Sequence, residues 1–164
     1  MTAVYGRGTH PLVKTSLATA ATAVVGSLAT ARSIDSRWYE KLDKPGFQPP
    51  GWVFPVAWTA LYTDIAVTTG LALKALPEAE RATLGRALGV NLALNAGWSI
   101  TFFGTRSVAA SVPVAAALAL SSADLVRRVG RAKKRYGVAL SPYAAWTAFA
   151  TVLSASLQER NPGE

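Results

Sequence analysis

The chain has 164 residues, of which 51% are hydrophobic and 16% are charged, with one histidine, no cysteine and a net charge of +8. Soluble domains carry about a quarter charged residues. The absence of cysteine excludes disulfides and thiol chemistry, and the lone His10 predicts no metal site because it lacks a second ligand. In so apolar a chain, the positive charge indicates basic loops that meet anionic lipid headgroups, and not nucleic acid.

Five apolar stretches are long enough to cross a bilayer, which takes roughly 20 residues as a helix. They cover residues 15–31, 52–73, 84–103, 108–126 and 140–157. We therefore predict an all-α integral membrane bundle of five transmembrane helices, forming one domain over residues 1–164. The sequence at 29–32 could pass for a signal-peptide cleavage site, but the four spans after it favour a retained first helix.

The connection at residues 32–51 is longer than an ordinary helix connection, and such loops are usually functional or disordered. It is rich in aromatic residues and proline, which favours an ordered loop at the membrane interface. Pro55 falls in the first turn of the following helix, where its missing N–H costs nothing.

The Lys and Arg residues are unevenly shared between the two sides of the predicted bundle. Eleven belong to the N-terminus and to the second and fourth connections, and six belong to the other side. The cluster at 127–135 supplies most of this excess. The positive-inside rule then places the N-terminus in the cytoplasm, and the absence of a transit peptide favours a bacterial inner membrane.

One face of the third stretch combines amides and aromatics, with Asn91, Asn95, Trp98 and Phe102 at spacings of four, three and four. Such a face is costly against lipid and should point into the bundle. Two interpretations stay open: hydrogen bonds between helices, or a polar anchor in a ligand pocket, which Trp98 favours. The opposite face is a stripe of small residues that could serve packing in the bundle or a homodimer: Gly85, Gly89, Ala93, Gly97, Thr101 and Thr105.

Trp58 and Trp146 lie too far inside their stretches for simple interfacial anchoring, which accounts for Trp52. Aromatic faces with few charges suit a flat, apolar, conjugated ligand. Asp64, inside the second stretch, is either a functional carboxylate or a bundle-facing acid bonded to a neighbour. Asp124 is expected to form an ion pair with Arg127 or Arg128.

Three segments resemble the translocator protein family, also called tryptophan-rich sensory proteins (TspO/MBR) or peripheral-type benzodiazepine receptors. They are WYEKLDKPGFQPPGWVFPVAWTALY at 38–62, NLALNAGWSITFFG at 91–104 and PYAAWTAFATVL at 142–153. The matches are in order and cover most of the chain except the first and fourth helices.

The resemblance implies binding of porphyrins (protoporphyrin or haem) in a pocket capped by the loop at 32–51, and a homodimer through the third helix. It implies no required cofactor, and the sequence offers no catalytic residue. The implied lid residues are Trp38, Tyr39, Pro49 and Pro50. The implied lining residues are Trp58, Tyr62, Asn91, Asn95, Trp98, Phe102, Trp146, Phe149, Ala150 and Leu153. The aromatics would stack on the ligand, the two asparagines would bond its polar edges, and Ala150 would leave space.

The chain also departs from the family pattern. Asn91 stands where the family usually has a glutamine, which preserves the amide, and Ser154 stands where the family has an asparagine. Ala155 takes the place of the tyrosine of the cholesterol-recognition pattern, which makes cholesterol binding doubtful. Ala110 occupies the place of a tryptophan that opens the fourth helix in many relatives.

Three functions remain open. A binding or sensory protein is favoured, a porphyrin transporter would use Asp64 for coupling, and a light-dependent porphyrin-degrading enzyme would use Trp38 or Trp146.

Overall fold

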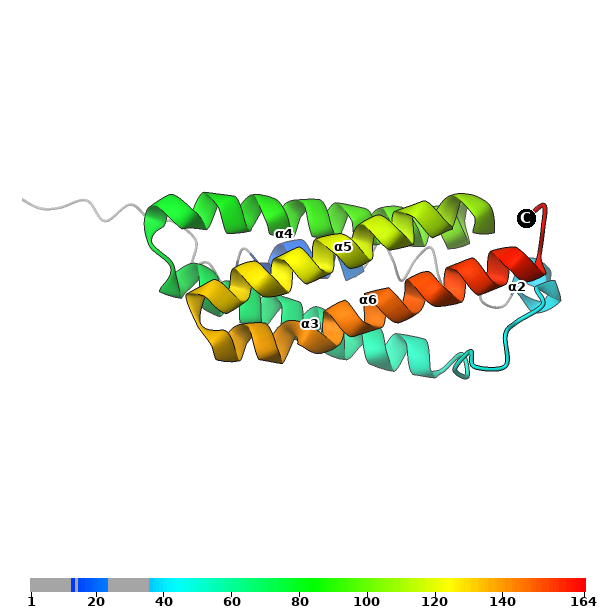
Figure 1. The fold of residues 1–164 in the computed structure, drawn as a ribbon, viewed down its shortest axis with the longest axis horizontal. Helices are drawn as coiled ribbons and strands as arrows, with labels where there is room; N and C mark the ends of the chain where they lie inside the picture. The colour runs from blue at the N-terminus through cyan, green and yellow to red at the C-terminus, as the bar shows by residue number, and fades with distance from the viewer. Residues whose placement is uncertain (1–12, 14, 24–35) are drawn as a thin grey trace, which may run out of the picture.

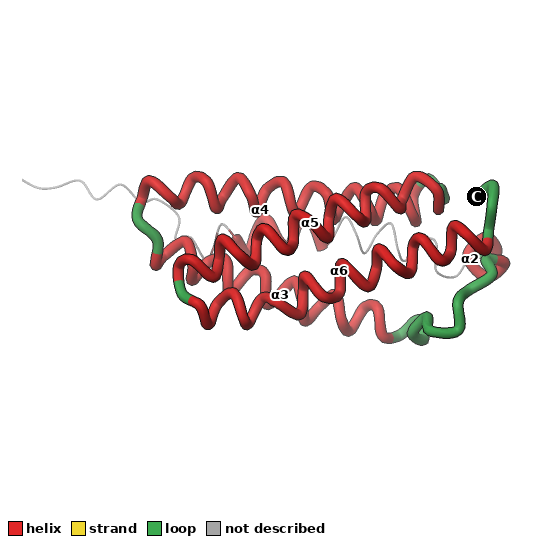
Figure 2. The backbone as a smooth tube through the Cα atoms, in the orientation of Figure 1, coloured by secondary structure: helices red, strands yellow, loops and turns green. Residues whose placement is uncertain are grey.

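The computed structural model describes residue 13, residues 15–23 and residues 36–164, and in this part of the chain every regular element is helical. The long helices run lengthwise beside one another, as Figures 1 and 2 show. The elements after residue 35 are α2 (Arg37–Lys41), α3 (Val53–Ala75), α4 (Glu78–Ser99), the π-helix η1 (Ile100–Gly104), α5 (Val108–Ala132) and α6 (Lys134–Arg160).

The all-α class is confirmed for the described residues, whereas the count of five membrane spans is not confirmed. Among the described residues, three helices, α3, α5 and α6, are long and apolar enough to cross a membrane. Helix α4 is not one of them; it carries Glu78, Glu80, Arg81 and Arg86 in its first half and Asn91 and Asn95 further along. Of the first predicted stretch only residues 15–23 are described; they are helical, and the Thr15 hydroxyl donates to the Ala66 carbonyl of α3 at 3.0 Å.

The predicted helices are too short wherever charged residues flank an apolar stretch. Helix α5 continues to Ala132 and α6 starts at Lys134, so only Lys133 remains of the predicted connection at 127–135. Arg and Lys are good helix formers, so the end of an apolar run is not the end of a helix. Helix α4 likewise begins at Glu78, six residues before the predicted start, directly after Pro77.

The predicted loop at 32–51 is partly helical, because α2 lies within it. The Ser36 hydroxyl caps this helix by accepting a hydrogen bond from the Tyr39 N–H. We call the described part of this connection, residues 36–51, the lid. In Figure 1 the lid and the C-terminus lie at one end of the bundle, and the α3–α4 and α5–α6 turns lie at the other.

In the described residues the core consists of two apolar clusters with a polar layer between them along α4. One cluster gathers leucines near the α3–α4 turn, including Leu84, Leu88 and Leu92. The other lies beneath the lid and includes Trp98 and Phe102. Asn95 lies on α4 between these two sets of residues and is fully buried.

Candidate functional site

A hydrogen-bonded layer crosses the middle of the bundle and joins four helices. The Tyr143 hydroxyl of α6 donates to Oδ1 of Asn91 at 2.7 Å, and Nδ2 of Asn95 donates to the Tyr143 oxygen at 3.3 Å. The Tyr62 hydroxyl of α3 donates to Oδ1 of Asn95 at 2.7 Å. Asn91, Asn95 and Tyr143 are all 0% exposed.

The second contact of Asn91 runs to α5. Its Nδ2 donates toward the hydroxyls of Ser121 at 3.2 Å and Ser122 at 3.1 Å. Both asparagine side chains therefore have protein partners for their oxygen and their nitrogen. Of the two interpretations that the sequence left open for these amides, this geometry favours hydrogen bonds between helices.

The aromatic side chains form a connected cluster between the polar layer and the lid. Trp58 of α3 lies 6.1 Å from Trp98 of α4 and 6.5 Å from Trp146 of α6, measured between ring centroids. Trp98 stacks on Phe102 at 5.9 Å, and Phe102 meets Trp38 of the lid edge-on at 5.8 Å. The lid, α3, α4 with η1, and α6 thus all contribute to one aromatic surface.

The π-helix η1 explains how two consecutive phenylalanines both face inward. The Thr105 N–H donates to the Ile100 carbonyl, five residues back, at 2.8 Å. Such a π-turn widens the helix locally and is frequent at functional sites. Phe102 and Phe103 are 3% and 9% exposed, and Phe103 packs 6.2 Å from the Tyr39 ring of the lid.

A small cavity lies between the lid, the start of α3, the end of α4 with η1, and the second half of α6. Its volume is about 20 Å³, which is room for roughly one water molecule. Its lining is mostly apolar and comprises Tyr39, Gln48, Phe54, Trp98, Phe102, Phe103, Leu153, Ser154 and Leu157.

Four of the residues expected at the site line this cavity, namely Tyr39, Trp98, Phe102 and Leu153. The others lie around it. Trp38, Trp58, Tyr62, Trp146 and Phe149 belong to the aromatic cluster, and Asn91 and Asn95 belong to the polar layer. Ala150 is buried on α6, Pro49 is half-buried and Pro50 is exposed, and none of these three lines the cavity.

The remaining lining residues were not predicted for the site. Phe54 and Phe103 stand in the motifs at 38–62 and 91–104, so the resemblance could have found them. Ser154, noted only as a departure from the family, accepts a hydrogen bond from Nε1 of Trp98 at 3.3 Å. Gln48 carries no signal in a single sequence, because it stands at a variable position of the family pattern.

Gln48 is the polar residue of the lid that faces the cavity. Its Nε2 donates to the Tyr39 hydroxyl at 3.1 Å, while its Oε1 is buried and has no hydrogen-bond partner. An unpaired buried polar atom costs free energy, and in a native structure it calls for a ligand, a water or another explanation.

Burial raises the pKa of Tyr39 above its ordinary value, a shift that the hydrogen bond with Gln48 partly opposes, so this phenol is neutral at physiological pH.

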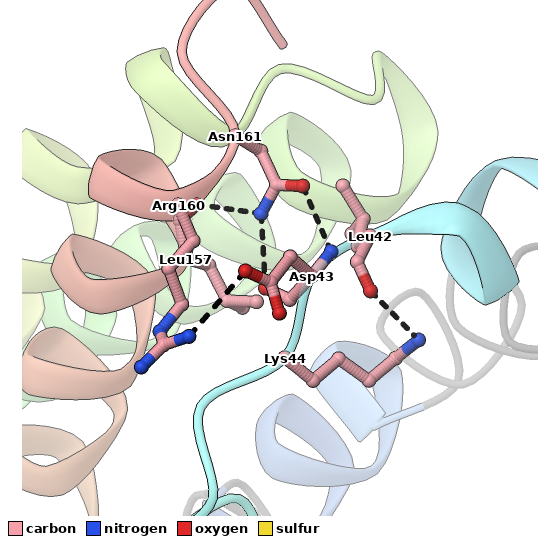
Figure 3. Close-up of polar contacts among 6 residues, drawn as sticks. All are labelled: Leu42, Asp43, Lys44, Leu157, Arg160 and Asn161. Carbon is pink, nitrogen blue, oxygen red and sulfur yellow. Dashed lines mark hydrogen bonds and ion pairs between the residues drawn. The ribbon is translucent and has the colours of Figure 1, made fainter.

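The C-terminal segment fastens the lid to the bundle, as Figure 3 shows. Oδ1 of Asn161 accepts from the Asp43 N–H at 2.9 Å, and its Nδ2 donates to the Asp43 carbonyl at 3.1 Å. Arg160 pairs with the Asp43 carboxylate at 3.4 Å. Inside the lid, Nζ of Lys44 donates to the Tyr39 and Leu42 carbonyls, and Leu42 is buried against the aromatic cluster.

The two acidic residues that the sequence singled out occupy different settings. Asp124 pairs with Arg127 and with Arg128, as predicted. Asp64 is half-buried on α3, and its backbone carbonyl accepts from the Thr68 hydroxyl at 2.6 Å. His10 and residues 24–35 lie outside the described residues, so the predictions made there stay predictions.

Comparison with known proteins supports the resemblance over nearly the whole chain. The model of the TspO/MBR family matches residues 15–160. Protein CrtK of Rhodobacter capsulatus is 34% identical over 77% of this chain and 80% of its own length. Tryptophan-rich protein TspO of Archaeoglobus fulgidus is 33% identical over 87% of this chain and 92% of its own. The human translocator protein is 35% identical over 77% of this chain and 76% of its own. The chain therefore belongs to the TspO/MBR family of membrane proteins.

Proposed function

We propose that this chain is a receptor-type membrane protein that binds porphyrins, or similarly flat hydrophobic molecules, between its lid and its aromatic cluster. The observation that carries the proposal is the joined ring surface of Trp58, Trp98, Phe102 and Trp146 beneath the lid. Stacking and area burial on such a surface suit a conjugated macrocycle. A relative from Cereibacter sphaeroides, 33% identical, is named a tryptophan-rich sensory protein.

Binding requires the lid to open. Ligand pockets for molecules of drug size hold roughly 300–1,000 Å³, whereas this cavity holds about 20 Å³. Leu42 and the rings of Trp38 and Tyr39 fill the space that a macrocycle would take. The hydrogen bonds between Asp43 and Asn161 then set how readily that space becomes accessible.

The ligand contacts follow from the atoms that remain available. The aromatics supply stacking, and the free Oε1 of Gln48 accepts a hydrogen bond from a donor on the ligand. Asn91 and Asn95 act one layer further away, by holding Tyr62 and the helices in place. The small side chain of Ala150 leaves space for the ligand beside α6, so a larger residue at this position would crowd the site.

The orientation we propose puts the lid on the outer side of a bacterial inner membrane and the N-terminus in the cytoplasm. The α3–α4 turn and the basic α5–α6 turn lie together at the end opposite the lid (Figure 1), and the positive-inside rule favours the cytoplasm for that end. We also propose a homodimer through α4, since Gly85, Gly89 and Ala93 are exposed along it and the space beside both glycines is open.

Two other functions remain candidates for the same fold. A light-dependent porphyrin-degrading activity would use Trp38 or Trp146, which the ring contacts through Trp58, Trp98 and Phe102 connect. A transporter would use Asp64 on α3. Unchanged pigment spectra of the bound porphyrin under light would remove the first, and vesicle flux that survives Asp64→Asn would remove the support for the second.

The direct test of the proposed function is a titration of the purified full chain with protoporphyrin, followed by tryptophan fluorescence. Saturable quenching that is weakened by Trp98→Leu supports the proposal. A chain that shows no saturable quenching, in detergent and in lipid, would contradict it.

A further inference from the structure

The end of the bundle opposite the lid carries a dense group of cations, here called the basic hairpin and defined as residues 127–135. Asp124 pairs with its first two arginines. The other four cations are Arg131, Lys133, Lys134 and Arg135. In the part of the chain that the structure describes, none of these four is ion-paired to a carboxylate, and Arg131, Lys133, Lys134 and Arg135 are all exposed.

The fold holds these cations close together. Gly130 of α5 and Gly137 of α6 pack backbone against backbone, and a Cβ on Gly137 would lie 2.8 Å from the Gly130 Cα and 3.0 Å from the Val126 oxygen. Only Lys133 separates the two helices. A hairpin this tight keeps the backbone positions of the four cations close together, so their mutual repulsion favours a bound anion.

Local helix electrostatics point the same way. Lys134 and Arg135 are the first residues of α6, where the partial positive charge of the helix dipole disfavours cations and favours an anion. No side chain caps this helix start.

From the start of α6, charged side chains are followed by an aromatic one and then by an apolar one. The Lys133 ammonium and the Arg135 guanidinium lie 5.9 and 5.2 Å from the centre of the Tyr136 ring. Val138 follows and is 63% exposed, at the start of a helix apolar enough to span the membrane. This order matches the headgroup, interface and acyl chains of a phospholipid.

We propose that the basic hairpin is a binding site for the phosphate headgroup of an anionic phospholipid, with the acyl chains lying against the exposed face of α6 at Val138. Arg131, Lys133, Lys134 and Arg135 hold the headgroup, and Tyr136 marks the depth of the interface. This site is separate from the proposed porphyrin site at the lid end.

The test places the full chain in nanodiscs of phosphatidylcholine, with or without phosphatidylglycerol, and counts retained lipids by native mass spectrometry. The test variant is Lys133→Gln/Lys134→Gln/Arg135→Gln. The matched control is Arg37→Gln/Lys41→Gln/Arg106→Asn, which removes three exposed cations at the lid end; asparagine suits the positive φ of 58° at Arg106.

We expect the wild type and the control to retain phosphatidylglycerol selectively, and the hairpin variant to bind it roughly a hundredfold more weakly. Porphyrin binding should stay unchanged in the hairpin variant, which checks folding. Equal retention by the hairpin variant and the wild type would overturn the proposal. Displacement of the lipid by free glycerol phosphate at equal concentration would do so as well, since the site would then be one for soluble phosphate.

A geometric variant separates the shape of the site from its charge. Gly137→Ala keeps every charge but forces α5 and α6 apart. We expect it to lower phosphatidylglycerol retention while thermal unfolding in phosphatidylcholine still reports a folded chain. Unchanged retention in a Gly137→Ala chain would contradict a site built by the hairpin geometry.

Discussion

The hydroxyl of Tyr143 on α6 donates to Oδ1 of Asn91 on α4 at 2.7 Å, and neither residue is exposed. This bond is the centre of the layer that also engages Asn95, Ser121 and Ser122. Each polar atom in such a layer depends on its partner, because an unpaired buried donor or acceptor costs more than a formed bond gains.

The first prediction concerns that bond. Tyr143→Phe removes the hydroxyl and leaves Oδ1 of Asn91 unpaired, so the free energy of unfolding should fall by about 0.6–2 kcal/mol. Thermal unfolding in detergent measures the change, with Tyr136→Phe at the half-buried start of α6 as the control. Porphyrin affinity should stay close to that of the wild type. A large loss of affinity without a loss of stability would mean that the layer contacts the ligand.

The second prediction concerns Gln48. Gln48→Met keeps the length of the side chain but removes the free Oε1 in the cavity, so porphyrin affinity should fall roughly two- to tenfold. Gln158→Met is the matched control, because Oε1 of Gln158 is also buried and unpaired while Gln158 does not line the cavity. Equal effects of the two substitutions in a fluorescence titration would argue against a ligand contact by Gln48.

The third prediction concerns the fastening of the lid. Asn161→Ala removes both side-chain bonds to the Asp43 backbone, so the lid should exchange amide hydrogen faster and porphyrin should associate and dissociate faster. Arg160→Gln removes only an ion pair between two exposed side chains, a type of contact worth roughly 0–1 kcal/mol, and should have little effect. Hydrogen exchange of residues 38–50 makes the comparison, and matching rates for Asn161→Ala and the wild type would be against this role.

The fourth prediction is a pH dependence from Tyr39. Burial raises the pKa of its phenol in the folded chain above the ordinary value near 10. The stability it supplies is therefore complete below about pH 10 and is lost as the pH rises through the raised folded pKa. Unfolding free energy measured from pH 7 to 11 should fall more steeply above pH 10 for the wild type than for Tyr39→Phe. Parallel curves would mean that the phenol ionises freely.

Features of the fold that depend on neighbouring residues could be predicted from the sequence, whereas contacts between residues far apart in the chain could not. Apolar length predicted the positions of the long helices α3, α4, α5 and α6, because helical spacing and burial are local properties. The resemblance to a known family implied most of the residues of the aromatic cluster. The starts of α6 at Lys134 and of α4 at Glu78 were not predicted. A charged residue ends an apolar stretch, but it is a good helix former and does not end a helix. The pairing of Asp43 with Asn161 joins residues 118 positions apart, and no local pattern predicts it.

The roles of Asn91 and Asn95 illustrate the same limit at the site. Their spacing placed both on one inward face, which the structure confirms through their burial. Whether an inward amide meets a ligand or another helix depends on the partner element, and the partners of Asn91 in this structure are Tyr143 and Ser122. Gln48, at a variable position of the lid, entered the site only through the folded geometry.

The central claim is that a flat ligand binds on the aromatic cluster beneath the lid, and one measurement tests it most directly. A protoporphyrin titration compares the wild type, Trp98→Leu in the cavity and Trp52→Leu, whose side chain is 69% exposed outside it. We predict saturable quenching with one ligand per chain, weakened roughly tenfold or more by Trp98→Leu and unchanged by Trp52→Leu. Equal affinities for all three chains, or no saturation in any, would contradict the account.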